Sequence, residues 1–212
     1  MINKETKLLY QGQASIRITT SDGHVIYIDP YAGTGYYKPA DLILMTHGHM
    51  DHCDIDKIEH QNKDCQIISW REAHPLSRYK NFDLGYVKVE PAEAGYNFFH
   101  SKSKCVGYVL TITEGDQAIK VYVSGDTSMT KQMAKMKAMA IDYAFYCCNE
   151  VFNMGLSEAT ECARMVDAKY NIPYHMSTKR IFDWEIVKKF DEPHRLIIED
   201  GQEIVLKPTS NL

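Results

Sequence analysis

The chain has 212 residues, of which 44% are hydrophobic and 25% are charged, and its formal net charge is −4. This length allows one substantial hydrophobic core, and we expect a single domain over residues 1–212. The acidic balance and the lack of a basic block argue against a nucleic-acid-binding protein. The N-terminal residues lead into no long apolar segment, so the sequence predicts neither a signal peptide nor a membrane anchor.

Hydrophobic patterns predict alternating strands and helices. A Ser-Asp-Gly turn at residues 21–23 joins two strands as a hairpin, since Asp-Gly tolerates the positive φ that tight hairpins require. In the first half, strands are expected at residues 7–10, 14–20, 24–28, 41–45, 65–69 (buried) and 86–90 (ended by Pro91), and helices at 54–60 and 71–78, the second broken by Pro75.

The second half continues this alternation without a repeat, a low-complexity tract or a linker. Ser157 is expected to cap a helix whose first turn is acidic, as the helix dipole prefers. Strands are expected at residues 107–112, 120–124, 142–147 and, with a turn, 172–178; helices at 131–140, 157–170 and 183–190; and a closing hairpin of 196–199 with 203–206.

Six cysteines are scattered through the chain without a C-x-x-C pair. A chain of this size does not need a disulfide framework, so we expect free thiols and a reducing, cytoplasmic location. Cys53 directly follows a histidine-rich segment and has two interpretations. It is either a small buried residue or a group close to a metal site.

That segment, residues 46–52 (Thr-His-Gly-His-Met-Asp-His), follows the apolar strand expected at 41–45. Packing does not explain three histidines and an aspartate at the end of a buried strand, because each side chain needs a polar partner. Alternate side chains of an extended segment share a face, so His47 and His49 can reach one ion. Asp51 and His52, in the turn beyond, can reach a second. These ligands suit zinc, iron or manganese, and the absence of cysteine argues against a purely structural zinc site.

Three further residues are candidate ligands, and each has an alternative interpretation. His100 lies in a loop-like segment and is either solvated or a ligand, with His74 as a weaker competitor. Asp126 follows an expected strand and can either bridge two cations or cap the next helix. Judged on the residues alone, a ligand role for His175 ranks only slightly above a structural role.

Together these segments resemble the metallo-β-lactamase superfamily. The similarity includes the His-x-His-x-Asp-His motif, Tyr96, Asn97 and His100 before a Gly-Tyr strand, the Gly-Asp at residues 125–126, and the Pro-x-His that ends at His175. The resemblance implies an α/β fold, the four-layer αββα sandwich, with a dinuclear metal site at the strand ends. It assigns His47, His49 and His100 to the first metal, Asp51, His52 and His175 to the second, and Asp126 to both.

The charges of this ligand set indicate the chemistry. We expect two divalent ions, with zinc as the first candidate and manganese or iron as alternatives. The ions bring four positive charges, and Asp51, Asp126 and a bridging hydroxide bring three negative charges. The remaining charge of about +1 favours a small anionic substrate. Metal coordination lowers the pKa of bound water to about 7 in favourable sites, which makes hydroxide available as a nucleophile. We therefore expect a metal-dependent hydrolase of an ester, lactone or phosphodiester. His47, His49 and Asp126 would hold the metals, while Asp51 orients the nucleophile or shuttles a proton.

The same motifs most resemble the L-ascorbate-6-phosphate lactonase-like branch, whose lactonases are longer than this chain. Lys102, Lys104, Lys179 and Arg180 lie near ligands in the sequence and either pair with a phosphate or remain solvated. The alternatives are an iron-dependent oxidoreductase resembling persulfide dioxygenases, a metal-binding protein without turnover, and a nuclease, which the acidic charge disfavours. The sequence leaves the oligomeric state open, and a homo-oligomer is compatible with it.

Overall fold

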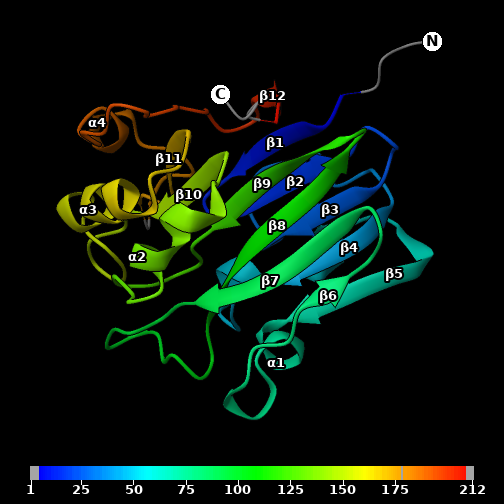
Figure 1. Ribbon diagram of the computed structural model, residues 1–212, viewed down its shortest axis with the longest axis horizontal. Coiled ribbons are helices and arrows are strands. Elements are labelled where there is room, and N and C mark those ends of the chain that lie inside the picture. The colour runs from blue at the N-terminus through cyan, green and yellow to red at the C-terminus, as the bar shows by residue number, and fades with distance from the viewer. Residues whose placement is uncertain (1–4, 178, 209–212) are drawn as a thin grey trace.

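The computed structural model describes residues 5–177 and 179–208. It contains two six-stranded sheets. The first sheet has, in order across it, β12 (Glu203–Val205), β1 (Lys7–Gly12), β2 (Ser15–Thr19), β3 (Val25–Ile28), β4 (Ala40–Met45) and β5 (Gln61–Ser69). The second has β11 (Tyr170–Tyr174), β10 (Tyr143–Cys147), β9 (Gln117–Val123), β8 (Val106–Glu114), β7 (Val87–Glu93) and β6 (Phe82–Asp83). Figure 1 shows the second sheet in front of the first.

Part of each sheet is parallel, and this determines where strand ends meet. β3, β4 and β5 run parallel in the first sheet, as do β9, β10 and β11 in the second. The other neighbouring strands pair antiparallel, including the expected hairpin of β2 and β3. The carboxyl ends of the parallel strands therefore lie at one edge of each sheet, which is the usual place for a site in such sheets.

The hydrophobic core lies between the two sheets. In β4, Leu42 and Leu44 belong to this core while Ile43 faces the other side, which is the alternation of a strand. Tyr108 of β8 connects the sheets, because its buried hydroxyl donates to the carbonyl oxygens of Met45 (3.0 Å) and Ile68 (3.2 Å). These bonds fix the second sheet against the end of β4, where the histidine-rich segment begins.

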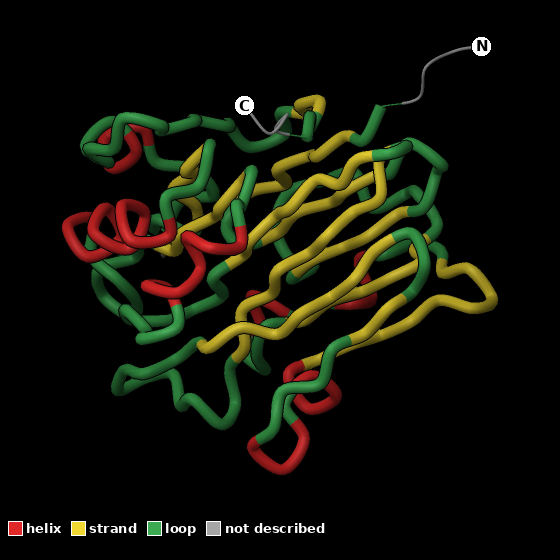
Figure 2. The backbone as a smooth tube through the Cα atoms, viewed as in Figure 1, coloured by secondary structure: helices red, strands yellow, loops and turns green. Residues whose placement is uncertain are grey.

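The helices are few and short. α2 (Met133–Met136), α3 (Leu156–Val166) and α4 (Trp184–Val187) gather beside β10 and β11, as Figures 1 and 2 show. On the outer face of the first sheet, Tyr27 and Ile43 are covered by Tyr36 and Ile58, which do not belong to an α-helix. The expected αββα class is confirmed, with thin outer layers. No helix within residues 5–177 and 179–208 is long and apolar enough to span a bilayer.

Two predictions beside β5 are wrong. Instead of the helix expected at 54–60, the chain forms only a 3-10 helix, Ile55–Lys57. The residues after it form hydrogen bonds to another segment, since the carbonyl oxygen of His60 accepts from the N–H of Ala40. β5 then begins at Gln61. It is an edge strand with only its last two residues buried, whereas the sequence predicts a buried strand at 65–69. The break at Pro75 is confirmed, since α1 (Trp70–Ala73) ends before it and a 3-10 helix follows.

Several element ends also differ from the sequence prediction. β7 does not end at Pro91 but continues to Glu93, beyond the last residue that pairs with β6, where a residue without an N–H is tolerated. Ser157 does not cap α3, whose N-cap is Gly155, and this helix already ends at Val166.

The remaining helices are shorter than expected, and the closing hairpin is absent. Residues 131–140 form α2 and a further 3-10 helix, Lys137–Met139, while residues 183–190 form only α4 with Asp183 as its N-cap. Residues 196–199 form no strand, because β12 pairs with β1 instead.

Candidate metal centre

The predicted ligands lie where strands of both sheets end. Residues 47–52 follow β4, and Met50–His52 form a 3-10 turn. His100 lies between β7 and β8, Asp126 follows β9, and His175 follows β11. The structure brings all seven predicted residues together in three overlapping groups with ligand atoms within 4.8 Å of one another: His47, His49 and His100; His47, His52 and Asp126; Asp51, His52 and His175.

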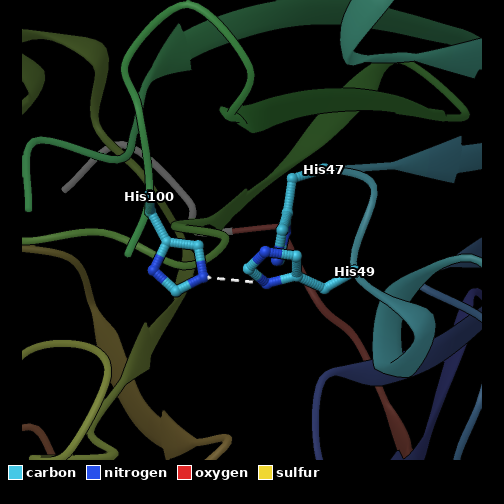
Figure 3. A group of neighbouring side chains, drawn as sticks. All are labelled: His47, His49 and His100. Atoms are coloured by element: carbon cyan, nitrogen blue, oxygen red, sulfur yellow. Dashed lines mark hydrogen bonds between the residues drawn. The ribbon is translucent and has the colours of Figure 1, made fainter. Parts of the chain in front are cut away.

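The first group joins two histidines of the β4 loop to one histidine of the other sheet. Figure 3 shows the rings of His49 and His100 turned toward each other beside His47. The Nε2 of His100 lies 3.2 Å from the Nδ1 of His49. His47 and His100 are buried and His49 is exposed, so this group has a solvent side.

The group of Asp51, His52 and His175, the second ligand group below, likewise joins two residues of the β4 loop to one histidine of the other sheet. The Nε2 atoms of His52 and His175 lie 3.3 Å apart, and an oxygen of Asp51 lies 3.7 Å from the Nε2 of His175. His175 has a φ of 45°, a left-handed conformation that turns the chain directly after β11. Its N–H donates to the carbonyl oxygen of Gln13 (2.9 Å), which holds this turn against the first sheet.

Asp126 lies between the two groups. Its Oδ1 is 3.5 Å from the Nε2 of His52, and its Oδ2 is 3.4 Å from the Nε2 atoms of both His100 and His175. The side chain of Asn153 donates to Oδ2 at 2.7 Å and orients the carboxylate. The alternative role as a helix cap is excluded, because α2 begins at Met133 with Gln132 before it.

The glycine before Asp126 has a physical reason. Gly125 has a φ of 61°, and a Cβ there would lie 2.8 Å from the carbonyl oxygen of Val106. Both observations exclude a side chain at this position without local rearrangement. Gly125 thus lets the chain pass close to the β8 backbone directly before Asp126.

Asp29 is a buried partner of the ligands that the sequence analysis did not find. It accepts hydrogen bonds from the N–H and hydroxyl of Thr46, both at 2.7 Å, and lies 2.8 Å from the Nδ1 of His52. Because a carboxylate accepts, Nδ1 of His52 carries a proton, and Nε2 is the ring nitrogen that faces the centre. The only sequence signal was an aspartate directly after a buried strand.

Two more rings are oriented in the same way. The Nδ1 of His47 lies 3.1 Å from the Thr46 hydroxyl, whose proton already goes to Asp29, and the Nδ1 of His100 lies 3.2 Å from the Oδ1 of Asn97. Both Nε2 atoms therefore face the centre as acceptors. Among the described residues, the buried Nε2 of His47 and Oδ1 of Asp126 have no hydrogen-bond donor. Converging lone pairs without donors fit a bound cation.

Burial and nearby charges set the protonation of these ligands. Burial lowers the pKa of His47, and His52 lowers it further. Burial also opposes charge on His52, but the carboxylates of Asp126 and Asp29 outweigh it and raise the pKa of His52 well above its usual value. Burial alone would raise the pKa of Asp126, but His175 and His52 hold it well below its usual range. A cation would thus replace a proton on His52 and meet an ionised carboxylate.

Two residues that the sequence analysis left open lie outside the ligand groups. The Sγ of Cys53 donates to the carbonyl oxygen of His49 (3.1 Å), so Cys53 supports the loop, half-buried. His74 stacks on Tyr79 with ring centroids 4.4 Å apart. Neither belongs to a candidate ligand group in the described part of the chain.

A cavity of about 600 Å³ opens beside the ligands. Gln13 and Tyr31 also line a second cavity, of about 480 Å³, which contains Lys57, Lys179 and Arg180 together with one carboxylate, Asp54. A third, of about 570 Å³, adjoins the first ligand group and contains Arg71 and Lys104. Cationic side chains therefore flank the centre on two sides. In the second cavity, Lys57, Lys179 and Arg180 outnumber the single carboxylate, Asp54.

Comparison with known proteins decides the family. Residues 7–175 match the sequence model of the beta-lactamase superfamily domain. The chain belongs to this superfamily. Among curated members, the UPF0173 metal-dependent hydrolase of Bacillus thuringiensis (strain Al Hakam) is 29% identical over 231 aligned residues, covering 94% of this chain and all of the relative. The expected enzyme class, a metal-dependent hydrolase of this superfamily, is confirmed.

Two solved structures have the same fold. A protein of Parabacteroides distasonis ATCC 8503 is 28% identical with a TM-score of 0.71, covering 93% of this chain and 94% of that one. A metallo-β-lactamase superfamily protein of Thermotoga maritima is 24% identical with a TM-score of 0.61, covering 87% and 84%. The second likeness is evidence for the superfamily fold alone.

Proposed function

We propose that this superfamily member binds two divalent cations, zinc first, and hydrolyses a small anionic ester, lactone or phosphodiester. The observation that supports this proposal is the position of Asp126, whose two oxygens face histidines of both ligand groups. His47, His49 and His100 would hold one ion, and Asp51, His52 and His175 the other. Bound at this place, such ions polarise the substrate and lower the pKa of water.

The residues of the chain have distinct tasks in this reaction. Asp51 is the most exposed carboxylate of the centre, with 37% of its side chain exposed, so it can orient the attacking water or accept its proton. Asp29 and Asn97 hold the histidine rings of His52 and His100 with their lone pairs toward the ions. Positioning by a rigid sheet is what such a centre requires.

The anionic character of the substrate is supported by the cations around the centre. Lys57, Lys179 and Arg180 lie in a cavity that shares two lining residues with the ligand cavity. A phosphate or carboxylate bound there would be attracted by these charges in a partly desolvated site. Lactones that carry a phosphate therefore belong in a substrate screen, together with phosphodiesters and simple esters.

Elemental analysis of protein purified without added metal tests this function first. About two zinc or manganese ions per chain, followed by hydrolysis of at least one compound of the screen, is the expected result. About one iron per chain, without hydrolysis, would assign redox chemistry to the centre instead. A metal-free protein that takes up no zinc would contradict the dinuclear site.

A further inference from the structure

Part of the lining of the ligand cavity is apolar, and we call this part the apolar wall. Met50, Phe99 and Phe152 form it and line the cavity together with the candidate ligands. Met50 is 84% exposed, Phe99 49% and Phe152 38%. Large apolar side chains that remain in contact with water around one cavity indicate a binding surface, because their hydration is unfavourable until something covers them.

The two phenylalanines form one surface although they come from different loops. Their ring centroids are 4.9 Å apart with an interplanar angle of 82°. This edge-to-face arrangement is the one that aromatic pairs prefer. A contact between loops that are distant in the sequence gives the wall a defined shape, which two independently mobile side chains would not have.

The turns that hold the ligands also hold this wall. The Oδ1 of Asn97 accepts from the N–H of Phe99 (3.0 Å) and from the N–H of His100 (2.8 Å). In the other loop, the carbonyl oxygen of Asn149 accepts from the N–H groups of Phe152 (3.1 Å) and Asn153 (2.8 Å). Asn153 in turn donates to Asp126. Each phenylalanine therefore precedes, in the same turn, a residue that forms or orients the metal centre.

We infer that Phe99, Phe152 and Met50 form a subsite for an apolar group of the substrate, an aryl or branched alkyl group attached close to the bond that is cleaved. This inference rests on the proposed function and adds the substrate feature that the cations do not explain. A cavity with apolar walls and a few convergent polar groups is the usual form of a small-molecule site. The apolar wall selects the substrate, while the ligands act on its polar centre.

Two hydroxamates test this subsite without any turnover. Acetohydroxamate and benzohydroxamate share the metal-binding group, but the first carries a methyl group where the second carries a phenyl ring. Their affinities for the metal-loaded protein are measured by titration calorimetry. We expect benzohydroxamate to bind about tenfold more tightly in the wild type, because the wall removes its ring from water. In Phe152→Ala this ratio should fall to about twofold, and in Phe152→Leu it should lie between these values.

Val151→Ala is the matched control. Val151 is 65% exposed and adjacent to Phe152, but it does not line the ligand cavity. This variant should keep the wild-type ratio of affinities. An unchanged ratio in both Phe152 variants would overturn the subsite. So would a dimer that Phe152→Ala dissociates while the ratio stays the same, since the wall would then be an interface between copies of the chain.

Failure of the proposed function gives a different result. If the protein binds no metal, elemental analysis shows it before any hydroxamate is used. If it binds metal but hydrolyses nothing in the screen, the ratio of the two affinities still reports on the wall. Circular dichroism of each variant ensures that a decrease in the ratio of the two affinities does not reflect an unfolded protein.

Discussion

At the residue scale, the centre combines a contiguous motif with side chains that no local pattern reveals. The histidine-rich segment is contiguous, so its four candidate ligands could be predicted from the sequence. Asp29 and Asn153 could not, because each contacts the centre only after strands from distant parts of the chain come together. Cys53 and His74 show the converse, since proximity in sequence or residue type suggested a role that their contacts do not support.

Removing a predicted ligand should separate metal binding from folding. His49→Ala and Asp126→Ala should abolish hydrolysis and most metal uptake while the circular dichroism spectrum remains that of the wild type, because the hydrophobic core lies between the sheets. His60→Ala is the matched control, since this exposed histidine lies outside the ligand groups. Full activity in either ligand variant would overturn the assignment.

The role of Asp29 predicts a weaker but distinct defect. Asp29→Asn keeps the shape of the side chain but removes the charge that orients His52, so zinc affinity should fall about 10- to 100-fold. Competition with a chromophoric chelator measures this affinity. Asp64→Asn, at an exposed position of β5, changes the same charge far from the centre and should leave affinity unchanged.

At the scale of elements, strands were predicted better than helices. Strand periodicity is local, and the central strands β4 and β8 lie within the expected segments or extend them by a few residues. The helix expected at 54–60 failed because backbone hydrogen bonds at both ends go to other segments, from the N–H of Asp54 to Pro30 and from the N–H of Glu59 to Tyr36. The burial of β5 also failed, because its place at the edge of the sheet follows from topology and not from its own residues.

A pair of leucines tests the assignment of the core to the space between the sheets. Leu110 of β8 is fully buried, whereas Leu76, beside α1, is 96% exposed. Leu110→Ala should lower the free energy of unfolding by about 2–5 kcal/mol through lost burial and a cavity. Leu76→Ala should change it by less than about 0.5 kcal/mol. Urea unfolding curves provide both values, and equal effects would contradict the observed packing.

At the scale of the whole molecule, the expectation of one domain over residues 1–212 stays a prediction, as do the cytoplasmic location and the oligomeric state. Thermal unfolding of the metal-free protein should show one cooperative transition, because a single core joins both sheets. Zinc at about 100 times its dissociation constant should raise the midpoint by about 5–10 °C, since the assembled ligands of the folded chain bind it more tightly than the unfolded chain does. Two separate transitions by calorimetry would argue for two domains.

Both ligand groups take members from each of the two sheets, and this has a mechanical consequence. The contact between His49 and His100 joins positions 51 residues apart, and that between His52 and His175 joins positions 123 residues apart. An ion held in each group would close these two long loops in the folded chain, and its binding free energy would add to the stability of that state. The six cysteines of this protein are free. The ions would thus tie one sheet to the other at the strand ends of a chain in which no disulfide bond does so.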